Sequence, residues 1–208
     1  MEENRKNTLC IGITGGLSSG KTTVAKIIEE QGYPVIYTDD LAKELMHNNE
    51  RIKKRIIKNF GDNTYNQDGT LNNEFLAEIV FADTEESYEN LQKLNVIVHP
   101  SVISEMMRLV DEYEKKGKKL VFVESALIYE MGLDEGFNYV MSVYTDEEIM
   151  MKRAVERGLT SEQIQHRLRE QLSAKQKQDW AEFSINNNGS LNELKEATLS
   201  LLDILKEL

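Results

Sequence analysis

Short apolar runs and a segment of helical spacing alternate at the start of the chain, and together they predict a βαβ unit. Residues 8–14 are apolar and β-branched and end at glycines, which is typical of a buried strand. Apolar residues then recur at helical spacing up to Gly32, which is placed to end a helix. Residues 34–40 form a second apolar run that ends in two aspartates. A strand, turn, helix and strand within about 30 residues predict a parallel sheet with a right-handed crossover.

The rest of the chain separates into a helical region and further strands. Residues 41–119 are mostly helical in pattern and highly charged, with a loop at 63–72, which indicates an inserted helical region. Two buried strands are predicted at 119–125 and 139–145, and a last strand and turn at 182–189. The predicted fold is α/β, a three-layer arrangement around a parallel five-stranded sheet.

Capping boxes mark the starts of three predicted helices in the second half of the chain. They pair Thr145 with Glu148, Thr160 with Gln163 and Ser190 with Glu193. The first helix runs through Arg157, where Gly158 can close it, and the second is very polar. The third has leucines at helical spacing and is expected to pack on the sheet.

Composition narrows the class of protein. The chain has 208 residues and a formal net charge of -11, which supplies no general attraction for a polyanion such as a nucleic acid. Its single cysteine, Cys10, excludes an intramolecular disulfide and a multi-cysteine zinc site. Because no apolar run approaches ~20 residues and the first seven residues do not resemble a targeting signal, we expect a soluble cytoplasmic protein without a membrane partner.

Residues 11–23, IGITGGLSSGKTT, contain two overlapping motifs that predict different chemistry. Residues 15–22 fit G-x-x-x-x-G-K-[ST], in which backbone amides hold phosphates, Lys21 neutralises phosphate charge and Thr22 ligates Mg²⁺. Residues 16–20 also fit G-x-S-x-G, the turn that presents the nucleophilic serine of many hydrolases. The serine turn needs a histidine and an acid, and it gives Lys21 and Thr22 no role, whereas the phosphate loop uses every fixed position. The sequence therefore predicts an ATP-binding loop made of Gly15, Gly16, Leu17, Ser18, Ser19, Gly20, Lys21, Thr22 and Thr23.

A small-molecule kinase fits the remaining sequence better than the other classes that use such a loop. A switch GTPase would need D-x-x-G and N-K-x-D motifs, and the sequence contains neither. A nucleic-acid motor would need a longer chain and a basic groove. A small-molecule kinase needs an acid for the acceptor hydroxyl, an acceptor domain and a mobile lid that carries arginines, and candidates for all three are present.

Two carboxylates are candidates for work at the carboxyl edge of the sheet, where ligands of open α/β folds bind. Asp39 ends the second predicted strand, so we expect it beside the phosphate loop, where it can accept the proton of the acceptor hydroxyl or orient that hydroxyl through a magnesium-bound water. The alternative role for Asp39 is a helix N-cap. Glu124 ends the third predicted strand and can hold a magnesium-bound water, or it is a solvated carboxylate at a strand end.

Basic residues late in the chain are candidates for contacts with phosphate. Arg153 and Arg157 are four residues apart and share one helix face, which suits the charge of a transferring phosphoryl group. Surface pairing with Glu147 or Glu156 is the alternative. The basic residues of 167–177 form either a solvated helix face or part of a lid over the phosphates. His99 and Pro100 are predicted to start a helix, and a histidine there contacts substrate or is structural.

Blocks of sequence spread over nearly the whole chain resemble the dephospho-CoA kinase family. They are IGITGGLSSGKTTVA, GYPVIYTDDLAKEL, IVHPSVI, ESALIYE, MKRAVERGLT, RLREQLSAKQK and INNNGSL. The chain departs from the family pattern at residues 126–130, where Ala-Leu-Ile-Tyr-Glu replaces Pro-Leu-Leu-Phe-Glu and predicts a looser turn. It departs again in the pair Ala181-Glu182, where the family has Ala-Asp, so that Glu182 stands in place of the aspartate.

The resemblance implies an activity and a division of the chain. It implies transfer of the γ-phosphoryl group of MgATP to the ribose 3'-hydroxyl of dephospho-CoA, with Asp39 as the acid–base residue. Arg153 and Arg157 would then clamp phosphate, and Asn187 would lie by the adenine of ATP. Residues 1–40, 118–150 and 180–208 would form the core, 41–117 the helical CoA-binding region and 151–179 the lid. A monomer or small homo-oligomer is expected. The alternatives to the dephospho-CoA kinase activity are another small-molecule or nucleoside monophosphate kinase with a phosphate loop, and a nucleotide-binding module without catalytic activity.

Overall fold

The chain divides into two compact units in the computed structural model, which describes residues 8–82 and 84–208. The core unit comprises the chain up to Tyr37 and Leu109–Leu208, and the helical unit is Thr38–Arg108. The predicted insertion, residues 41–117, covers most of the same stretch as the helical unit. The first seven residues, where no targeting signal is predicted, lie outside the described residues.

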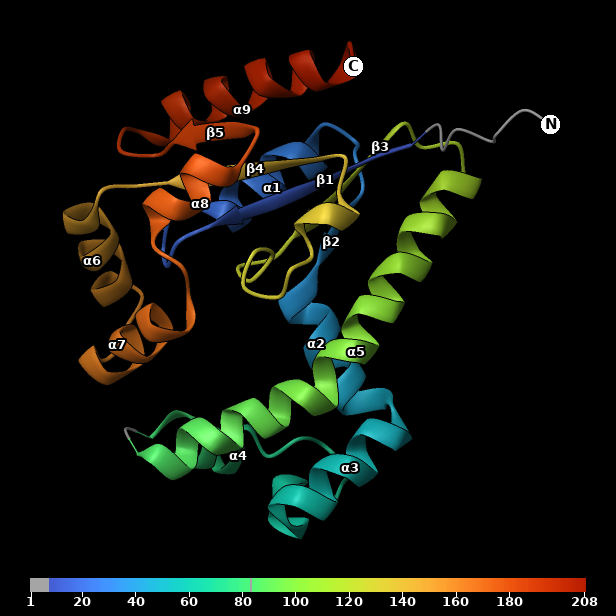
Figure 1. Ribbon diagram of the computed structural model, residues 1–208, viewed down its shortest axis with the longest axis vertical. Helices are drawn as coiled ribbons and strands as arrows, with labels where there is room; N and C mark the ends of the chain where they lie inside the picture. The colour runs from blue at the N-terminus through green and yellow to red at the C-terminus, as the bar shows by residue number, and fades with distance from the viewer. Residues whose placement is uncertain (1–7, 83) are drawn as a thin grey trace. The chain divides into compact units, whose positions relative to one another are not determined.

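A sheet of five parallel strands forms the centre of the core unit (Figure 1). The fold class is α/β with a parallel five-stranded sheet, as the sequence predicted. The strand order is β2-β3-β1-β4-β5, so the strand from the middle of the chain, β3, lies between the two strands of the first βαβ unit. The strands are β1 (Leu9–Gly15), β2 (Val35–Tyr37), β3 (Leu120–Glu124), β4 (Tyr139–Tyr144) and β5 (Phe183–Asn186).

One face of the sheet is covered by α1 (Lys21–Glu30) and α9 (Leu191–Lys206), which contact each other. Ile11 and Ile13 of β1 point into this core, where they meet apolar residues of both helices. The leucines predicted to pack on the sheet from α9 lie in the same core; they are Leu194, Leu201, Leu202 and Leu205. The capping box of Ser190 and Glu193 starts α9 as predicted, and Gly32 follows the end of α1 with a φ of 86°.

The face of β1 opposite Ile11 and Ile13 meets a second layer, made of the turn after β3 and helix α8 (Ala174–Trp180). Gly12 lies between Ile11 and Ile13, and a Cβ placed on it would be 2.8 Å from Ile128 in the turn after β3. Helix α8 contacts β1 and β4 but contributes nothing to the core shared by α1 and α9. The turn after β3 ends in the short 3-10 helix η2 (Asp134–Gly136).

Helices α6 (Glu147–Glu156) and α7 (Ser161–Glu170) lie between β4 and α8 in sequence. Figure 1 shows them as a pair set off from the sheet, whereas α8 lies against it. They have their own apolar cluster, in which Met150, Ala154 and Ile164 pack with Leu17 of the phosphate loop. The capping box of Thr160 and Gln163 starts α7 as predicted.

The helical unit is built from helices with little strand structure, as predicted for the insertion. Its elements are α2 (Thr38–Asn48), α3 (Glu50–Phe60), the 3-10 helix η1 (Asp62–Thr64), α4 (Asn73–Phe81) and the first part of α5 (Glu85–Lys115). Asn49 and Asn72 accept hydrogen bonds from backbone amides at the starts of α3 and α4, which satisfies groups that lack a partner within the helix.

Two predicted element boundaries in the helical unit were wrong. Helix α2 begins at Thr38, so Asp39 and Asp40 lie in its first turn and do not end β2. His99 and Pro100 lie inside the long helix α5 and do not start a helix. Apolar residues on both sides of Pro100 are buried in the same helix, including Leu94, Ile97 and Val102, and this burial outweighs the loss of one backbone hydrogen bond at proline.

Two predicted features of the core unit were also wrong. Asp146, not Thr145, is the N-cap position of α6, and Thr145 turns to the loop after β5 instead. The polar segment predicted as one helix is divided into α7 and α8, because a second capping box at Ser173 and Gln176 starts a new helix. No helix of the described residues is long and apolar enough to cross a membrane.

Candidate active site

The loop between β1 and α1 has backbone angles that require glycine at two positions. Gly15 has a φ of 149° and Gly20 a φ of 100°. A Cβ on Gly15 would lie 2.1 Å from the carbonyl oxygen of Val143, and one on Gly20 would lie 2.2 Å from Nδ2 of Asn187. The glycines of the motif therefore permit both the turn and the close approach of neighbouring elements. Ser18 also has a positive φ, 50°, at the tip of the loop.

Lys21 folds back over the phosphate loop. Its Nζ donates hydrogen bonds to the carbonyl oxygens of Gly15, at 3.1 Å, and Gly16, at 2.9 Å. Helix α1 begins at Lys21, as predicted, and its first turn, all of which is described, carries no acidic side chain. The positive end of the helix and the ammonium group therefore lie at the same turn, an arrangement that favours an anion there.

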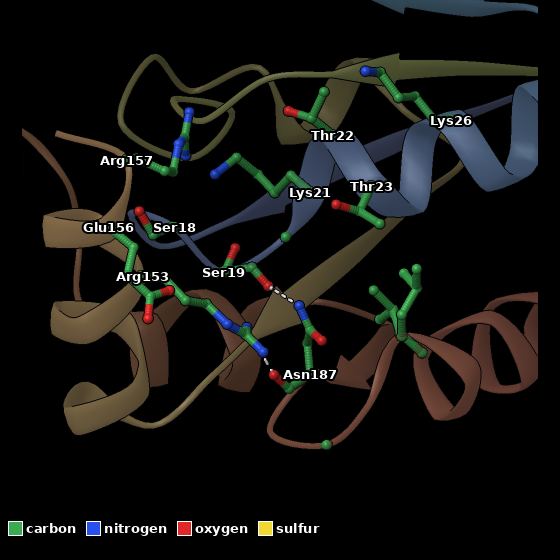
Figure 2. A pocket seen from close by; sticks show the side chains of 14 residues that line it. Ser18, Ser19, Lys21, Thr22, Thr23, Lys26, Arg153, Glu156, Arg157 and Asn187 are labelled. Carbon is green, nitrogen blue, oxygen red and sulfur yellow. Dashed lines mark hydrogen bonds between the residues drawn. The ribbon is translucent and has the colours of Figure 1, made fainter. Parts of the chain in front are cut away.

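A pocket of about 530 Å³ opens beside the loop, and three parts of the core unit line it. The loop and α1 supply Ser18–Thr23 and Lys26, α6 with its C-cap residue supplies Arg153, Glu156 and Arg157, and the region after β5 supplies Asn187, Gly189, Leu191 and Leu194. Figure 2 shows the ammonium of Lys21 and the hydroxyls of Thr22 and Thr23 on one side of it and the side chain of Asn187 on another. The lining is cationic at the loop and apolar near α9, which suits a triphosphate joined to an aromatic base.

Asn187 connects the region after β5 to the phosphate loop. Its side-chain Nδ2 donates to the carbonyl oxygen of Ser19 at 2.7 Å, and the side chain is buried (Figure 2). Its backbone carbonyl accepts from Nη1 of Arg153 at 2.9 Å and from the hydroxyl of Thr145 at 3.2 Å. Asn187 lines the pocket, and its amide group supports the shape of the loop; the predicted contact with adenine stays a prediction.

Both predicted arginines line the pocket, and the structure brings them to it from one helix. Arg153 extends toward Asn187, and Arg157 lies at the C-cap position of α6 (Figure 2). Among the described residues, no ion pair joins either guanidinium to Glu147 or Glu156, although Glu156 lines the same pocket. Both guanidiniums therefore belong to the pocket lining, and that of Arg153 is held there by the carbonyl oxygen of Asn187.

The predicted acids and His99 do not line this pocket. Glu124 is buried at the end of β3, in register with Ile13 of β1 and Tyr37 of β2. Since β3 separates β2 from β1, strand adjacency places Glu124 next to the loop strand, while the predicted place of Asp39 beside the loop stays a prediction. Asp39 and His99 belong to the helical unit, and partial burial lowers the pKa of His99. Their roles stay predictions.

The donor groups at the loop fit Mg²⁺ bound together with a nucleotide. The described residues contain no group of three or more His, Cys, Asp or Glu side chains that would hold a metal alone. Mg²⁺ in kinases is held instead by one or two protein oxygens together with substrate phosphates. The hydroxyl of Thr22 in the pocket and the carboxylate of Glu124 beside β1 are oxygen donors of this kind.

Several residues at the site were missed by sequence reasoning. Lys26 follows Thr22 by one helical turn, so its spacing in the sequence was a usable signal. Gly189, Leu191 and Leu194 surround the capping box that starts α9, and nothing in their spacing indicates a ligand. Glu182, which departs from the family pattern, accepts a hydrogen bond from the amide of Val140 at 2.7 Å and thus has a structural role at β4.

Comparisons with known proteins give consistent results. The chain matches the family model for dephospho-CoA kinase over residues 9–193. It is 37% identical over 181 residues to the dephospho-CoA kinase of Shouchella clausii (strain KSM-K16), a match that covers 86% of this chain and 90% of that protein. The dephospho-CoA kinase of Halalkalibacterium halodurans is 35% identical, with 95% and 96% covered. The crystal structure of TT1252 from Thermus thermophilus matches with a TM-score of 0.75 and 33% identity, covering 95% of this chain and 98% of that chain.

Proposed function

The chain belongs to the dephospho-CoA kinase family, and from this premise we propose how its residues transfer the γ-phosphoryl group of ATP to the ribose 3'-hydroxyl of dephospho-CoA. The observation that carries the proposal is the formed phosphate loop, in which Lys21 lies over the turn and the pocket beside it holds two arginines without carboxylate partners among the described residues. This reaction is the last step of coenzyme A synthesis.

The phosphate loop holds the β- and γ-phosphates through its backbone amides and through Lys21. To bind them, the ammonium of Lys21 gives up its hydrogen bonds to the carbonyl oxygens of Gly15 and Gly16. Arg153 and Arg157 face the transferring group and stabilise the charge that spreads over its oxygens. Thr22, with Asp39 or Glu124 through water, would hold Mg²⁺, which supplies charge neutralisation at the phosphates when it is bound. Asn187 keeps the loop in place and flanks the adenine.

Asp39 accepts the proton of the attacking 3'-hydroxyl, or orients that hydroxyl. Asp39 lies in the first turn of α2, which directly follows the carboxyl end of strand β2. Ligands of parallel sheets bind at the carboxyl ends of the strands. Residues 41–117 hold dephospho-CoA, with His99 as a contact, and residues 151–179 act as the lid. The substrates are small molecules, and the reaction needs neither nucleic acid nor membrane. The proposal also places the enzyme in the cytoplasm.

An assay of ADP release with a panel of acceptors tests the proposed function. Dephospho-CoA, adenosine and several nucleoside monophosphates are supplied in turn with ATP and Mg²⁺. We expect turnover with dephospho-CoA alone, and the product should carry its new phosphate on the 3' oxygen by phosphorus NMR. Turnover with a nucleoside monophosphate would favour another phosphate-loop kinase, and ATP binding without any turnover would favour a nucleotide-binding module.

Replacement of Asp39 by asparagine separates its proposed role from a structural one. We expect kcat to fall by about 10²–10⁴, the usual contribution of a positioned general base, while ATP affinity changes little. Asp40→Asn is the matched control, because Asp40 is adjacent, exposed and paired with Lys43 at 2.9 Å. Loss of ATP binding alone in the Asp39 variant would instead give this residue a structural role in the first turn of α2 or a role as a metal contact.

A further inference from the structure

A buried ion pair joins α8 to the turn after β3, outside the pocket just described. Lys177 is completely buried, and its Nζ lies 2.7 Å from Oε1 of Glu130 and donates to the carbonyl oxygen of Ala126 at 2.5 Å. Trp180 of the same helix meets Tyr129 of the same turn edge to face, with ring centroids 5.5 Å apart. The turn that departs from the family pattern at residues 126–130 is therefore fixed to α8 by a charge pair and an aromatic contact.

Stability alone does not explain a buried charge pair at this place. Removing two charges from water is unfavourable, and well-packed apolar residues of similar volume often serve a fold equally well. Burial lowers the pKa of Lys177, although Glu130 opposes this shift by stabilising the ammonium form. The second carboxylate oxygen of Glu130, Oε2, is buried and accepts no hydrogen bond from the described residues. The next question is therefore what the pair holds in position.

The same oxygen of Glu130 that meets Lys177 also holds the joint between α7 and α8. The amide of Leu172 donates to Oε1 of Glu130 at 2.7 Å. Leu172 lies between the end of α7 at Glu170 and the start of α8 at Ala174. This joint lines a second cavity, of about 430 Å³, together with Gly16 and Leu17 of the phosphate loop. Ala174 lies against the loop, since a Cβ on Gly16 would be 3.4 Å from its Cβ.

The opposite end of the segment formed by α6 and α7 is held as well. The side chain of Asn188 accepts hydrogen bonds from the hydroxyl of Thr145 at 2.9 Å and from the amide of Asp146 at 2.8 Å. Between these two ends the segment carries Arg153 and Arg157 and touches the phosphate loop through the cluster around Leu17. Both ends are therefore fixed to the core, and α6 with α7 is the part between them that is set off from the sheet (Figure 1).

We propose that Glu130, held by Lys177, is a positioning residue that fixes the joint at Leu172, so that α6 and α7 close on the bound nucleotide with their arginines in register with the phosphates. The inference rests on the proposed function for its reaction, and it places the moving part at residues 147–170, with α8 belonging to the core. The expected lid, residues 151–179, is shortened at its end by this proposal. A shift of this joint would move both arginines relative to the phosphate loop.

Two double variants isolate the hydrogen bond at the joint from the charge pair. Glu130→Leu with Lys177→Met removes both charges and also the acceptor for the amide of Leu172. Glu130→Gln with Lys177→Met removes the same charges but keeps a side-chain oxygen as acceptor. Neither leaves an unpaired buried charge, so we expect both to fold. Lys206→Met is the surface control, because Lys206 is an exposed residue of α9, outside the lid and the pocket, and is paired with Asp203 at 2.8 Å.

The readouts are kcat, ATP affinity by direct titration, and trypsin cleavage after the arginines of α6 and α7. In the double variant that carries Glu130→Leu, we expect kcat to fall between about tenfold and a hundredfold, because a misplacement of about 1 Å at a reacting centre has an effect of this size. The ATP affinity of this variant should change by less than about threefold. A non-hydrolysable ATP analogue should protect these arginines in the wild type and in the Glu130→Gln double variant but not in the Glu130→Leu double variant. The surface control should behave as the wild type.

Equal kcat and equal protection in the two double variants would overturn the proposal, because the pair would then serve the fold alone. Should either double variant fail to fold, Leu172→Pro removes the same amide donor without a change of charge. Gln171 already has the extended backbone, φ -110° and ψ 142°, that a following proline requires. The protection experiment needs only nucleotide, so it still tests the joint if the wild type proves inactive toward dephospho-CoA, a result that would count against the proposed function alone.

Discussion

At the scale of single residues, the proposed phosphate site has one ammonium group already in place over the loop. Lys21 donates to the carbonyl oxygens of Gly15 and Gly16, so no large side-chain movement is needed to bring its charge to the turn. In the proposed mechanism the ammonium exchanges these two carbonyl partners for phosphate oxygens while the side chain stays at the turn. Lys26 lines the same pocket but lies one turn further along α1.

Lys21→Ala should lower kcat by about 10²–10³, or about 2.7–4 kcal/mol, the range measured for removal of one well-placed donor at a reacting centre. We expect the fold to remain intact, because Lys21 is on the pocket surface and not in the apolar core. Steady-state kinetics with a thermal melt as a fold check makes the measurement. Lys26→Ala should have a much smaller effect on kcat, and equal effects of the two changes would remove the special role of Lys21.

Gly20 is required for space as well as for backbone angle, and two glycines of the chain separate these effects. Gly20→Ala would place a Cβ 2.2 Å from Asn187 Nδ2 at a φ of 100°, so the bond from Asn187 to Ser19 should break and ATP binding should be lost. Gly32 has a similar φ of 86°, and a Cβ added there would have no atom within 4 Å, so Gly32→Ala meets only the backbone strain. That strain costs about 1–2 kcal/mol of stability.

Titration with a fluorescent ATP analogue and a denaturant melt of both variants make this comparison. The Gly32 variant should lose stability and keep nucleotide binding. If the Gly20 variant also kept full affinity for nucleotide, the contact between Asn187 and the loop would have no part in binding.

At the scale of elements, the long helix α5 holds a half-buried histidine next to a proline in its interior. Burial lowers the pKa of His99 below its ordinary value of 6.5, because the charged imidazolium loses hydration there. The folded state therefore binds fewer protons than the unfolded state between the folded pKa and about 6.5. Stability contributed by neutral His99 is fully present above pH 6.5 and is lost as the pH falls toward the folded pKa.

His99→Asn should remove this component of the pH dependence. The difference in unfolding free energy between wild type and variant should shrink as the pH falls from 7 to 5, measured by urea melts at fixed ionic strength. A difference that is constant over this range would contradict the burial of a neutral imidazole. If His99 also contacts substrate, the variant should raise the KM for dephospho-CoA and leave that for ATP unchanged.

Elements whose information is local were predicted well from the sequence. The phosphate loop, the start of α1 at Lys21 and the capping boxes at Thr160 and Ser190 each depend on residues within a few positions of one another. Thr145 fits the same capping pattern, yet its hydroxyl bonds to the loop after β5. A hydrogen bond to a segment distant in sequence outweighs a local one here, and nothing near Thr145 signals it.

At the scale of the whole molecule, the pairing of distant segments could not be predicted. The sheet order places β3 between β1 and β2, although β2 follows β1 in sequence and the chain between β2 and β3 forms the separate helical unit. Lys177 occurs in a polar helix pattern that favours a solvated position, and it is nonetheless completely buried against Glu130. Its partner lies in a turn far along the chain, so composition and periodicity carry no signal of the pair.

The division into two units predicts that the two substrates protect different parts of the chain from amide hydrogen exchange. The pocket beside the phosphate loop is lined wholly by the core unit, so a non-hydrolysable ATP analogue should slow exchange at residues 15–23 and 187–194. Dephospho-CoA alone should slow exchange within Thr38–Arg108, because the proposed acceptor region lies there. Both together should also slow exchange at 147–170, since closure of α6 and α7 needs the nucleotide and excludes water once the acceptor is present.

Adenosine serves as the control acceptor, because it lacks the pyrophosphate and pantetheine that the helical unit would bind. Protection by dephospho-CoA that stayed within the core unit would refute the assignment of the helical unit to this substrate while leaving the ATP site intact.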